Sequence, residues 1–468
     1  MRNRLTERIA ALVVAGFFLG GCSSSPMGNL VSGVPPPAGS LGQAAPSAFA
    51  GTDAYDTAVD YVATFYPLWF TYEQWKISSV NQLIGPRAMD PIYHAVVAPN
   101  DDTLYANSVV DLTKEPLILT IPATKDIYSV LSTDAFGDVN DTGIKDSGTY
   151  GLTGPNWKGK LPPGVTQVSL PTNFSALIIR VDKYSPEGEN EKAEAERFRR
   201  NLHAAPLALY VKNHAARPAR IVSVLYFSAP FKQAADELAT NESIAFLGEL
   251  QKAVASANPP ALTPSEQRLS DRFNALFNAK TRNDSAFIDG TRKAHELILS
   301  RYLDHLDKNN WIGFATIGTT WGRVVRSSIS EFIQYGNSHA TAAYYQTFKD
   351  GSGKALDGRA HQYVLTFSKD EIPQAQRFWS VTGYLPDSIT LIKNSANKYL
   401  IGSYTPGLQK NKDGSISLYM AQRKPKGVPA ANWLPVPKGQ FNLMLRVYGP
   451  EGRVAHDTYI PPAVVTTR

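Results

Sequence analysis

Apolar residues between positions 53 and 85 recur at three- and four-residue steps. Ala58, Tyr61 and Phe65 belong to this series. Such steps place apolar side chains on one face of an α-helix, so the pattern predicts a helix over this segment. Pro67 lies inside it. Because a proline lacks the backbone N–H that a helix interior needs, we expect Pro67 to kink or split the helix.

The spacing changes between positions 92 and 182, where short β-rich runs are separated by turn residues. Several short strands at this spacing indicate a β-sandwich. The expected strands cover 104–112, 117–122, 127–136, 165–170 and 174–181.

Helical spacing returns from 187 to about 310. Thr263 and Glu266 flank a proline and a serine, which is the composition of a helix capping box with proline at the first helical position. The residues after this box carry apolar side chains on one face, so we expect a helix to begin there.

Strands are predicted again from 360 onward, at 362–367, 378–383, 399–404, 415–420 and 441–448. Asp413-Gly414 is typical of a hairpin between the third and fourth of these strands. This part of the chain indicates a second, jelly-roll-like sandwich. The predicted fold class is therefore α+β, with two β-sandwich domains joined by a helical segment.

The N-terminus has the composition of an export signal. Three arginines and one glutamate precede an apolar run from Ile9 to Leu19, which is much shorter than the roughly 20 residues of a membrane-spanning helix. Leu19-Gly20-Gly21-Cys22 resembles the lipobox of bacterial lipoproteins, which implies cleavage before Cys22 and a diacylglyceryl group on its sulfur. The alternative is an ordinary signal peptide followed by an incidental cysteine. The serine after Cys22 implies sorting to the outer membrane, on its periplasmic or its surface face.

The composition divides the chain into five expected parts. Residues 1–21 are the signal peptide, and residues 22–50, which hold no charged side chain and much Ser, Pro, Gly and Ala, are a disordered tether. We expect an N-terminal β-sandwich over 51–185, a helical linker region over 186–345 and a C-terminal β-sandwich over 346–468. Cys22 is the only cysteine, so disulfide bonds are excluded.

The charge pattern does not indicate a nucleic-acid partner. The formal net charge is +6 over 468 residues, and nucleic-acid binders usually concentrate their positive charge in a patch. A dense basic run, 197–200, follows several glutamates of the same expected helix. We therefore expect the membrane, through the lipid on Cys22, and a small-molecule ligand as partners, and the pattern names no protein partner.

Two blocks of sequence resemble known families. The first begins with Asn100-Asp101-Asp102-Thr103-Leu104-Tyr105, and the second includes FWSVTGY at 378–384 and FNLMLRVYGP at 441–450. Together they resemble the paired bacterial families called domain of unknown function 1254, at the N-terminus, and domain of unknown function 1214, at the C-terminus. The resemblance implies two β-sandwich domains joined by helices, and it implies no activity.

Many members of these families carry a tyrosine followed by Arg-Ala in the segment that reads WGRVVRSS here, at 321–328. The resemblance makes Arg326 the candidate for that arginine, although the sequence around it departs from the family pattern.

Motifs for metals and cofactors are missing from the sequence. The eight histidines form neither His-x-His nor HExxH, and no glycine-rich phosphate loop follows an expected strand. We predict no metal and no cofactor.

Five residues are candidates for ligand binding: Asp102, Tyr105, Trp433, Arg446 and Arg326. Asp102 precedes a strand, where it can cap a turn, contact a ligand or act as a general acid. Arg446 interrupts an apolar strand, and a buried charge needs a partner. That partner could be a carboxylate such as Asp102 or Asp111, in an interdomain ion pair, or an anion in a cleft. Tyr105 and Trp433 could stack on a flat ligand or fill the sandwich ends.

Three functional interpretations remain open. The first is an envelope-anchored lipoprotein that binds a small polar or carbohydrate-like ligand or an envelope partner. The alternative is a periplasmic hydrolase or lyase, in which Asp102 acts as acid or base and Arg446 stabilises an anion in an interdomain cleft. The third is a structural envelope protein without a ligand.

Overall fold

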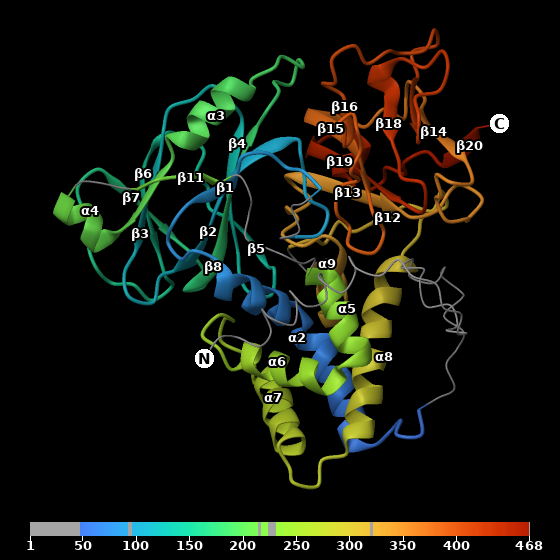
Figure 1. Ribbon diagram of the computed structural model, residues 1–468. Helices are drawn as coiled ribbons and strands as arrows, with labels where there is room; N and C mark the ends of the chain where they lie inside the picture. Colours follow the sequence, from blue (N-terminus) through green and yellow to red (C-terminus); the bar gives the residue numbers. More distant parts are fainter. Residues whose placement is uncertain (1–46, 92–95, 214–216, 223–230, 319–321, 468) are drawn as a thin grey trace, which may run out of the picture.

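Four sheets and a group of helices make up residues 47–91, 96–213, 217–222, 231–318 and 322–467, which the computed structural model describes. The sheets are arranged in two pairs, and the two pairs lie beside each other with most of the helices packed below them (Figure 1). The predicted α+β class with two sandwiches is confirmed.

The N-terminal sandwich consists of a six-stranded and a five-stranded sheet. The six-stranded sheet has the order β11 (Arg220–Val222), β1 (Ile84–Pro86), β2 (Thr103–Asp111), β8 (Phe174–Asp182), β4 (Tyr128–Thr133) and β5 (Val139–Asp141). The five-stranded sheet has the order β10 (Arg217–Pro218), β9 (His203–Pro206), β3 (Leu117–Ile121), β6 (Gly148–Thr153) and β7 (Val165–Ser169). Helix α3 (Lys192–Arg200) packs on β2 and β8 of the six-stranded sheet, and helix α4 (Leu207–Asn213) packs on β3 and β9 of the five-stranded sheet.

The C-terminal sandwich consists of a five-stranded and a four-stranded sheet. The five-stranded sheet has the order β12 (Ile312–Gly313), β13 (Ala342–Thr347), β19 (Asn442–Pro450), β15 (Ala375–Tyr384) and β16 (Leu400–Gly402). The four-stranded sheet has the order β18 (Trp433–Pro435), β17 (Ile416–Ala421), β14 (Gln362–Phe367) and β20 (Val464–Thr467). A 3₁₀ turn, η1 (Ala430–Asn432), and a short helix, α10 (Gly452–Ala455), lie in its loops.

The remaining helices form what we call the helical body. It contains α2 (Asp53–Ile77), α5 (Phe231–Asn241), α6 (Ser243–Val254), α7 (Pro264–Phe277), α8 (Asp284–Leu303) and α9 (Arg323–Phe332). α2 lies at its centre and packs against α6, α7, α8 and α9. The predicted capping box of α7 is confirmed, because the Thr263 hydroxyl accepts from the Glu266 N–H at 3.3 Å and the Glu266 carboxylate accepts from the Thr263 N–H at 2.9 Å.

Helix α2 runs unbroken through Pro67, so the expected split does not occur. Pro67 has no N–H to donate to the carbonyl of Ala63. The hydroxyl of Ser327 in α9 donates to that carbonyl instead, at 2.9 Å, and Arg326 Nη2 donates to the next carbonyl, that of Thr64, at 3.3 Å. Hydrogen bonds from α9 therefore reach the backbone carbonyls of the helical turn that precedes Pro67.

The central strands of both sandwiches are buried on both faces. In β8, Leu177 and Ile179 point into the core of the N-terminal sandwich, while Ala176, Ile178 and Arg180 point away from that core, towards the helical body. Alternation along a strand requires this division. The outer face of β8 thus carries Arg180 beside apolar residues, with Asp182 on the same face at the end of the strand.

Strand β19 has the same arrangement in the C-terminal sandwich. Leu445 and Val447 point into its core, and Met444, Arg446 and Tyr448 lie on the opposite face. The two outer faces and the helical body share one continuous apolar core. As a result, two arginines from different sandwiches are brought into the same interior region.

Two local expectations need correction. The segment expected to be helical from 187 to about 310 contains β9, β10 and β11, which pair with the N-terminal sheets. The Asp413-Gly414 turn forms, with Gly414 at φ +85° and Asp413 Oδ1 accepting from the Ser415 N–H at 3.0 Å. It does not join a hairpin, however, because β16 pairs with β15 and β17 belongs to the other sheet. The two strands on either side of the turn therefore belong to different sheets and do not pair with each other.

In the described part of the chain, no helix combines the length and the apolar character that crossing a membrane requires.

Candidate functional site

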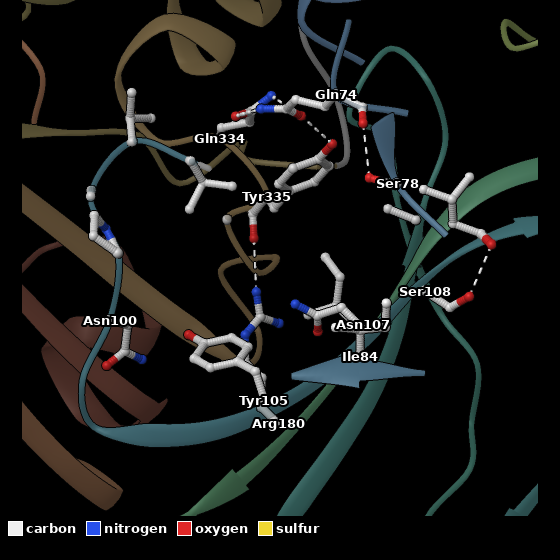
Figure 2. A pocket seen from close by; sticks show the side chains of 18 of the residues that line it. Gln74, Ser78, Ile84, Asn100, Tyr105, Asn107, Ser108, Arg180, Gln334 and Tyr335 are labelled. Carbon is white, nitrogen blue, oxygen red and sulfur yellow. Dashed lines mark hydrogen bonds between the residues drawn. The ribbon is translucent and has the colours of Figure 1, made fainter. Parts of the chain in front are cut away.

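A cavity lies where the outer faces of the two sandwiches meet the C-terminal end of α2. Its volume is about 180 Å³. β2 and β8 line it from the N-terminal sandwich, β13 and β19 from the C-terminal sandwich, and residues 333–336 after α9 close it on another side. We call it the inter-sandwich cavity. Figure 2 shows Arg180 and Tyr105 at its wall, with Gln334 and Tyr335 on the side that faces them.

Arg180 projects into this cavity from β8 and has only neutral partners. Its Nη1 donates to Asn337 Oδ1 at 2.8 Å and its Nη2 to the Tyr335 carbonyl at 2.9 Å. The guanidinium lies 5.6 Å from the centre of the Tyr105 ring. Burial lowers the pKa of Arg180, but nearby tyrosines, Tyr105 first, raise it more, so the net shift is upward. The group is therefore a permanent buried cation.

Arg446 enters the same cavity from β19, and its partners are neutral as well. Its Nη1 donates to the Tyr384 hydroxyl at 2.8 Å and to Thr382 Oγ1 at 3.3 Å, and its Nη2 donates to the Ala98 carbonyl at 2.6 Å. Burial lowers the pKa of Arg446, and Tyr384 leads the groups that raise it above the usual value. Within the described part of the chain, no carboxylate forms a salt bridge with Arg446 or with Arg180.

Two tyrosine hydroxyls complete this polar end of the cavity. The Tyr344 hydroxyl accepts from both the backbone N–H and the side-chain amide of Asn337, each at 2.9 Å, and the Tyr448 hydroxyl accepts from Asn100 Nδ2. Burial raises the pKa of both tyrosines, so both keep their protons. No described residue accepts either proton in a hydrogen bond. The two hydroxyls thus offer hydrogen-bond donors for which the described residues provide no acceptor.

The facing wall of the cavity is polar but internally satisfied. Gln74 Nε2 donates to Gln334 Oε1 at 2.8 Å, the Tyr335 hydroxyl donates to Gln74 Oε1 at 2.7 Å, and Trp75 Nε1 donates to the Tyr335 hydroxyl at 3.2 Å. The rest of the lining is mainly apolar. One further acceptor, Asn107 Oδ1, is buried there without a hydrogen-bond partner among the described residues.

Asp102 is brought near Arg446 but not into contact with it. Its side chain is 0% exposed and is not part of the cavity lining. Its Oδ2 accepts from Ser380 Oγ at 2.8 Å, and its Oδ1 accepts from the Tyr404 hydroxyl. Burial raises the pKa of Asp102, while Tyr404, Arg446 and Ser380 partly offset that rise. Asp102 therefore ties the start of β2 to the C-terminal sandwich.

A different residue pair makes the ion pair between the sandwiches. Arg377 Nε donates to Asp182 Oδ2 at 2.8 Å, and a second hydrogen bond joins Arg377 Nη2 to Asp182 Oδ1. In the described structure, Arg446 and Asp102 therefore do not form a direct ion pair, which was one interpretation of the sequence.

The other sequence candidates lie apart from one another. Tyr105 lines the cavity. Trp433 begins β18 in the outer sheet of the C-terminal sandwich, where its Nε1 donates to the Ala421 carbonyl at 2.9 Å. Arg326 lies in α9 and places its guanidinium 3.8 Å from the centre of the Phe136 ring. Cys22 lies outside the described residues. Only Tyr105 and Arg446 meet in the cavity.

Sequence reasoning missed Arg180, although the signal was present. FSALIIRVD and NLMLRVYGP, the sequences of β8 and β19, each contain a single arginine in a strand that is otherwise almost entirely apolar. A lone arginine in such a strand indicates a buried cation, which needs hydrogen-bond partners or an opposite charge.

A neighbouring cavity of about 590 Å³ shares Met89 and Tyr105 with the inter-sandwich cavity. It is larger, but its most buried cations already have carboxylate partners. Lys183 Nζ lies 2.7 Å from Asp101 Oδ1, and Arg199 is bound to Glu196. Because those charges are compensated within the protein, the smaller cavity is the better candidate for a ligand site.

A second buried polar cluster lies in the helical body. Lys232 Nζ is 2.7 Å from Asp236 Oδ2 and 2.6 Å from Glu331 Oε1. His295 Nε2 lies 3.1 Å from Asp236 Oδ1, and the Tyr66 hydroxyl donates to Glu331 at 2.6 Å. Ligand atoms of Asp236, His295 and Glu331 lie within 4.8 Å of one another, as a metal would require. A metal would have to displace the Lys232 ammonium, so we treat the cluster as a structural network.

The fold and the cavity define a two-sandwich protein with an arginine-lined site between its sandwiches. Residues 80–206 match a family model described as protein of unknown function (DUF1254), and residues 341–452 match one described as protein of unknown function (DUF1214). The chain belongs to the two-domain family that combines them, which confirms the resemblance found in the sequence.

A solved structure shares this fold, and a second one is less similar. The VPA0106 protein from Vibrio parahaemolyticus is 21% identical, with a TM-score of 0.56, over 89% of this chain and all of its own. An uncharacterised protein from Burkholderia cenocepacia is 14% identical, with a TM-score of 0.41, over 88% of this chain and 95% of its own. No functionally curated protein matches the chain.

Proposed function

We propose that this protein binds a small polar molecule in the inter-sandwich cavity. The observation that carries the proposal is that Arg180 and Arg446 are both buried at the cavity wall without a carboxylate partner. An isolated buried charge is costly unless an opposite charge or several hydrogen bonds compensate it. A bound ligand with acceptor oxygens would supply what the protein does not.

The Tyr344 and Tyr448 hydroxyls support the same conclusion. Each has accepted hydrogen bonds and retains a proton for an acceptor. A carbohydrate would need acceptors as well as donors at the site, and the lining offers mainly donors near the arginines. Trp433, the candidate for stacking on a sugar, lies in the outer sheet. Among polar ligands, these features favour one that is rich in acceptors.

The experiment is to weigh the full chain in detergent, first as the native protein and then after denaturation. A mass lost on denaturation identifies a retained ligand, and Ala176→Phe, which fills the cavity from β8, should abolish that retention. Lys293→Met on the exposed side of α8 is the control. Retention that survives Ala176→Phe in a folded protein would contradict the proposal.

The hydrolase or lyase interpretation has less support. It requires Asp102 to exchange a proton with a substrate, and a general acid must come within hydrogen-bond reach of the reacting group. Asp102 is fully buried, and both of its oxygens accept from side chains of the C-terminal sandwich. We therefore retain binding as the proposed function.

Envelope anchoring is a further part of the proposal, and it rests on the sequence Leu19-Gly20-Gly21-Cys22. A lipid on Cys22 would hold the folded body at a membrane surface through the uncharged segment 23–50. Metabolic labelling with a radioactive fatty acid tests it. Wild type should take up label and Cys22→Ser should not, and equal labelling of the two would contradict the anchor.

A further inference from the structure

We propose that the ligand of the inter-sandwich cavity is a monoanionic organic acid with an apolar body. Its carboxylate would be bound by Arg180 and by the Tyr344 and Tyr448 hydroxyls, and its apolar part would lie against the central walls. This inference rests on the proposed function and adds the charge and the shape of the ligand.

The charge follows from a count of buried groups. Asp102 lies behind Ser380, the residue opposite Arg446 in the pairing of β15 with β19. Asp102 accepts hydrogen bonds at both oxygens, which is the pattern of an ionised carboxylate. It therefore offsets the positive charge of Arg446 at longer range. Arg180 has no such partner, so one positive charge remains, and a single negative charge would neutralise it.

The proximity of Arg180 and Tyr344 indicates where the acid group would bind. Asn337 binds Arg180 through its side-chain oxygen and Tyr344 through its two N–H groups, so it holds these two side chains beside each other. Electrostatic coupling also links Tyr344 and Tyr448 to both arginines. A carboxylate beside Arg180 can thus accept from a guanidinium and from tyrosine hydroxyls, and such charge-assisted hydrogen bonds are the strong ones.

The apolar body follows from the rest of the lining. The cavity lining includes these apolar residues: Trp75, Met89, Val97 from the loop before β2, Ile178 from β8 and Ile333 after α9. A highly hydrated anion such as inorganic phosphate would leave these walls without contacts. An alkyl or aryl group would bury against them, and about 25 cal/mol is gained for each Å² of apolar surface removed from water.

The test is titration calorimetry on the full chain in detergent with four probes: octanoate, phenylacetate, octan-1-ol and inorganic phosphate. Octanoate or phenylacetate should bind at least about tenfold more tightly than octan-1-ol, which corresponds to one charge-assisted hydrogen bond, and phosphate should not compete with them. Arg180→Met should remove this preference for the acid while leaving octan-1-ol binding unchanged.

Tyr344 and its neighbour Tyr345 provide a matched pair that does not depend on how Arg180→Met folds. Tyr344→Phe removes one cavity donor and should weaken acid binding by about three- to tenfold. Tyr345 lies on the opposite face of β13, in the core of the C-terminal sandwich, and its hydroxyl has no partner in the described structure. Tyr345→Phe should leave acid binding unchanged.

The outcomes separate the two proposals. Equal or tighter binding of octan-1-ol than of both acids, or equal acid affinity in Tyr344→Phe and Tyr345→Phe, would overturn the organic acid while leaving a cavity ligand possible. Tighter binding of phosphate would overturn the apolar body. Binding of every probe that persists in Ala176→Phe, or no binding of any probe to wild type freed of retained ligand, would overturn the proposed function itself.

Discussion

Two regions of this molecule bury positive charge, and they compensate it in opposite ways. In the helical body, the Lys232 ammonium lies between the carboxylates of Asp236 and Glu331, at 2.7 and 2.6 Å. In the inter-sandwich cavity, Arg180 and Arg446 donate only to amide, hydroxyl and carbonyl oxygens. The protein completes the first arrangement by itself, whereas the second has space beside it for a molecule from outside.

The presence or absence of a carboxylate partner distinguishes a structural ion network from a candidate ligand site. A buried pair costs desolvation energy that is recovered only when its geometry is good, and breaking it leaves a charge exposed to an apolar interior. An arginine without a counter-ion carries that cost in the unliganded state. Removing such an arginine should therefore affect binding more than stability, and removing a paired cation should do the reverse.

We expect the largest change in stability when Lys232 is replaced. Lys232→Met leaves two carboxylates facing each other in the helical body, and it should lower the free energy of unfolding by about 3–5 kcal/mol. Urea denaturation followed by circular dichroism measures it. Lys293→Met breaks an exposed pair with Glu296 and should cost less than about 1 kcal/mol. Similar losses in the two variants would remove the distinction between the regions.

The next largest difference in stability is expected between substitutions of two arginines, Arg377 in β15 and Arg180 in β8. Arg377→Met removes the partner of buried Asp182 and should cost about 3 kcal/mol of stability. Arg180→Met removes an uncompensated charge, so the stability of the ligand-free protein should stay within about 1 kcal/mol of wild type. The same denaturation experiment checks both. A greater loss for Arg180→Met would show that Arg180 serves the fold.

The paired cluster should also respond to pH. Burial raises the pKa of Glu331 to about 7 from the usual 4.5, with Asp236 adding to the rise and Lys232 opposing it. The folded state thus binds this proton more tightly than the unfolded state, so the stabilisation is present at low pH and is lost as pH rises towards 7. Burial also raises the pKa of Asp236, but Lys232 and His295 lower it more, so its titration is complete below this range.

Stability of wild type relative to Glu331→Gln should therefore fall by about 1–3 kcal/mol between roughly pH 5 and pH 8. Urea denaturation of both proteins at a series of pH values measures the difference. A difference that is constant or that grows with pH would contradict this ionisation of the cluster.

The smallest effect concerns the two aromatic candidates from the sequence. Trp433→Ala should lower the melting temperature and leave octanoate affinity within about twofold, because distant sites without shared partners rarely couple. Tyr105→Ala removes a ring beside Arg180 and should weaken that affinity clearly. Thermal melts and calorimetry on both variants provide the test, and a loss of binding in Trp433→Ala would place the ligand elsewhere.

Features set by neighbouring residues could be predicted from the sequence. The capping box of α7 and the strands around 103–111, 174–182 and 442–450 depend on local spacing, and the structure contains them. The continuity of α2 could not be predicted, because Ser327 satisfies the carbonyl that Pro67 leaves free, and that residue is far away in the sequence.

The candidate site shows the same limit. The arginine in β19 was visible as a charge in an apolar strand, but its relation to Arg180 depends on how two sandwiches meet. Likewise, the pair of Lys232 with Asp236 lies four residues apart on one helix, whereas Glu331 joins them from α9. Tertiary packing, and not spacing, decides which buried charge finds a partner.

The central claim is that Arg180 in the inter-sandwich cavity lacks a counter-ion that a ligand provides. The most direct measurement is the free energy of unfolding of wild type and Arg180→Met, each with and without saturating octanoate. A ligand that binds only the folded state adds stability in proportion to the logarithm of its concentration over its dissociation constant. At the same octanoate concentration, we predict a clearly larger gain in wild type than in Arg180→Met. Equal gains in the two proteins would contradict the account.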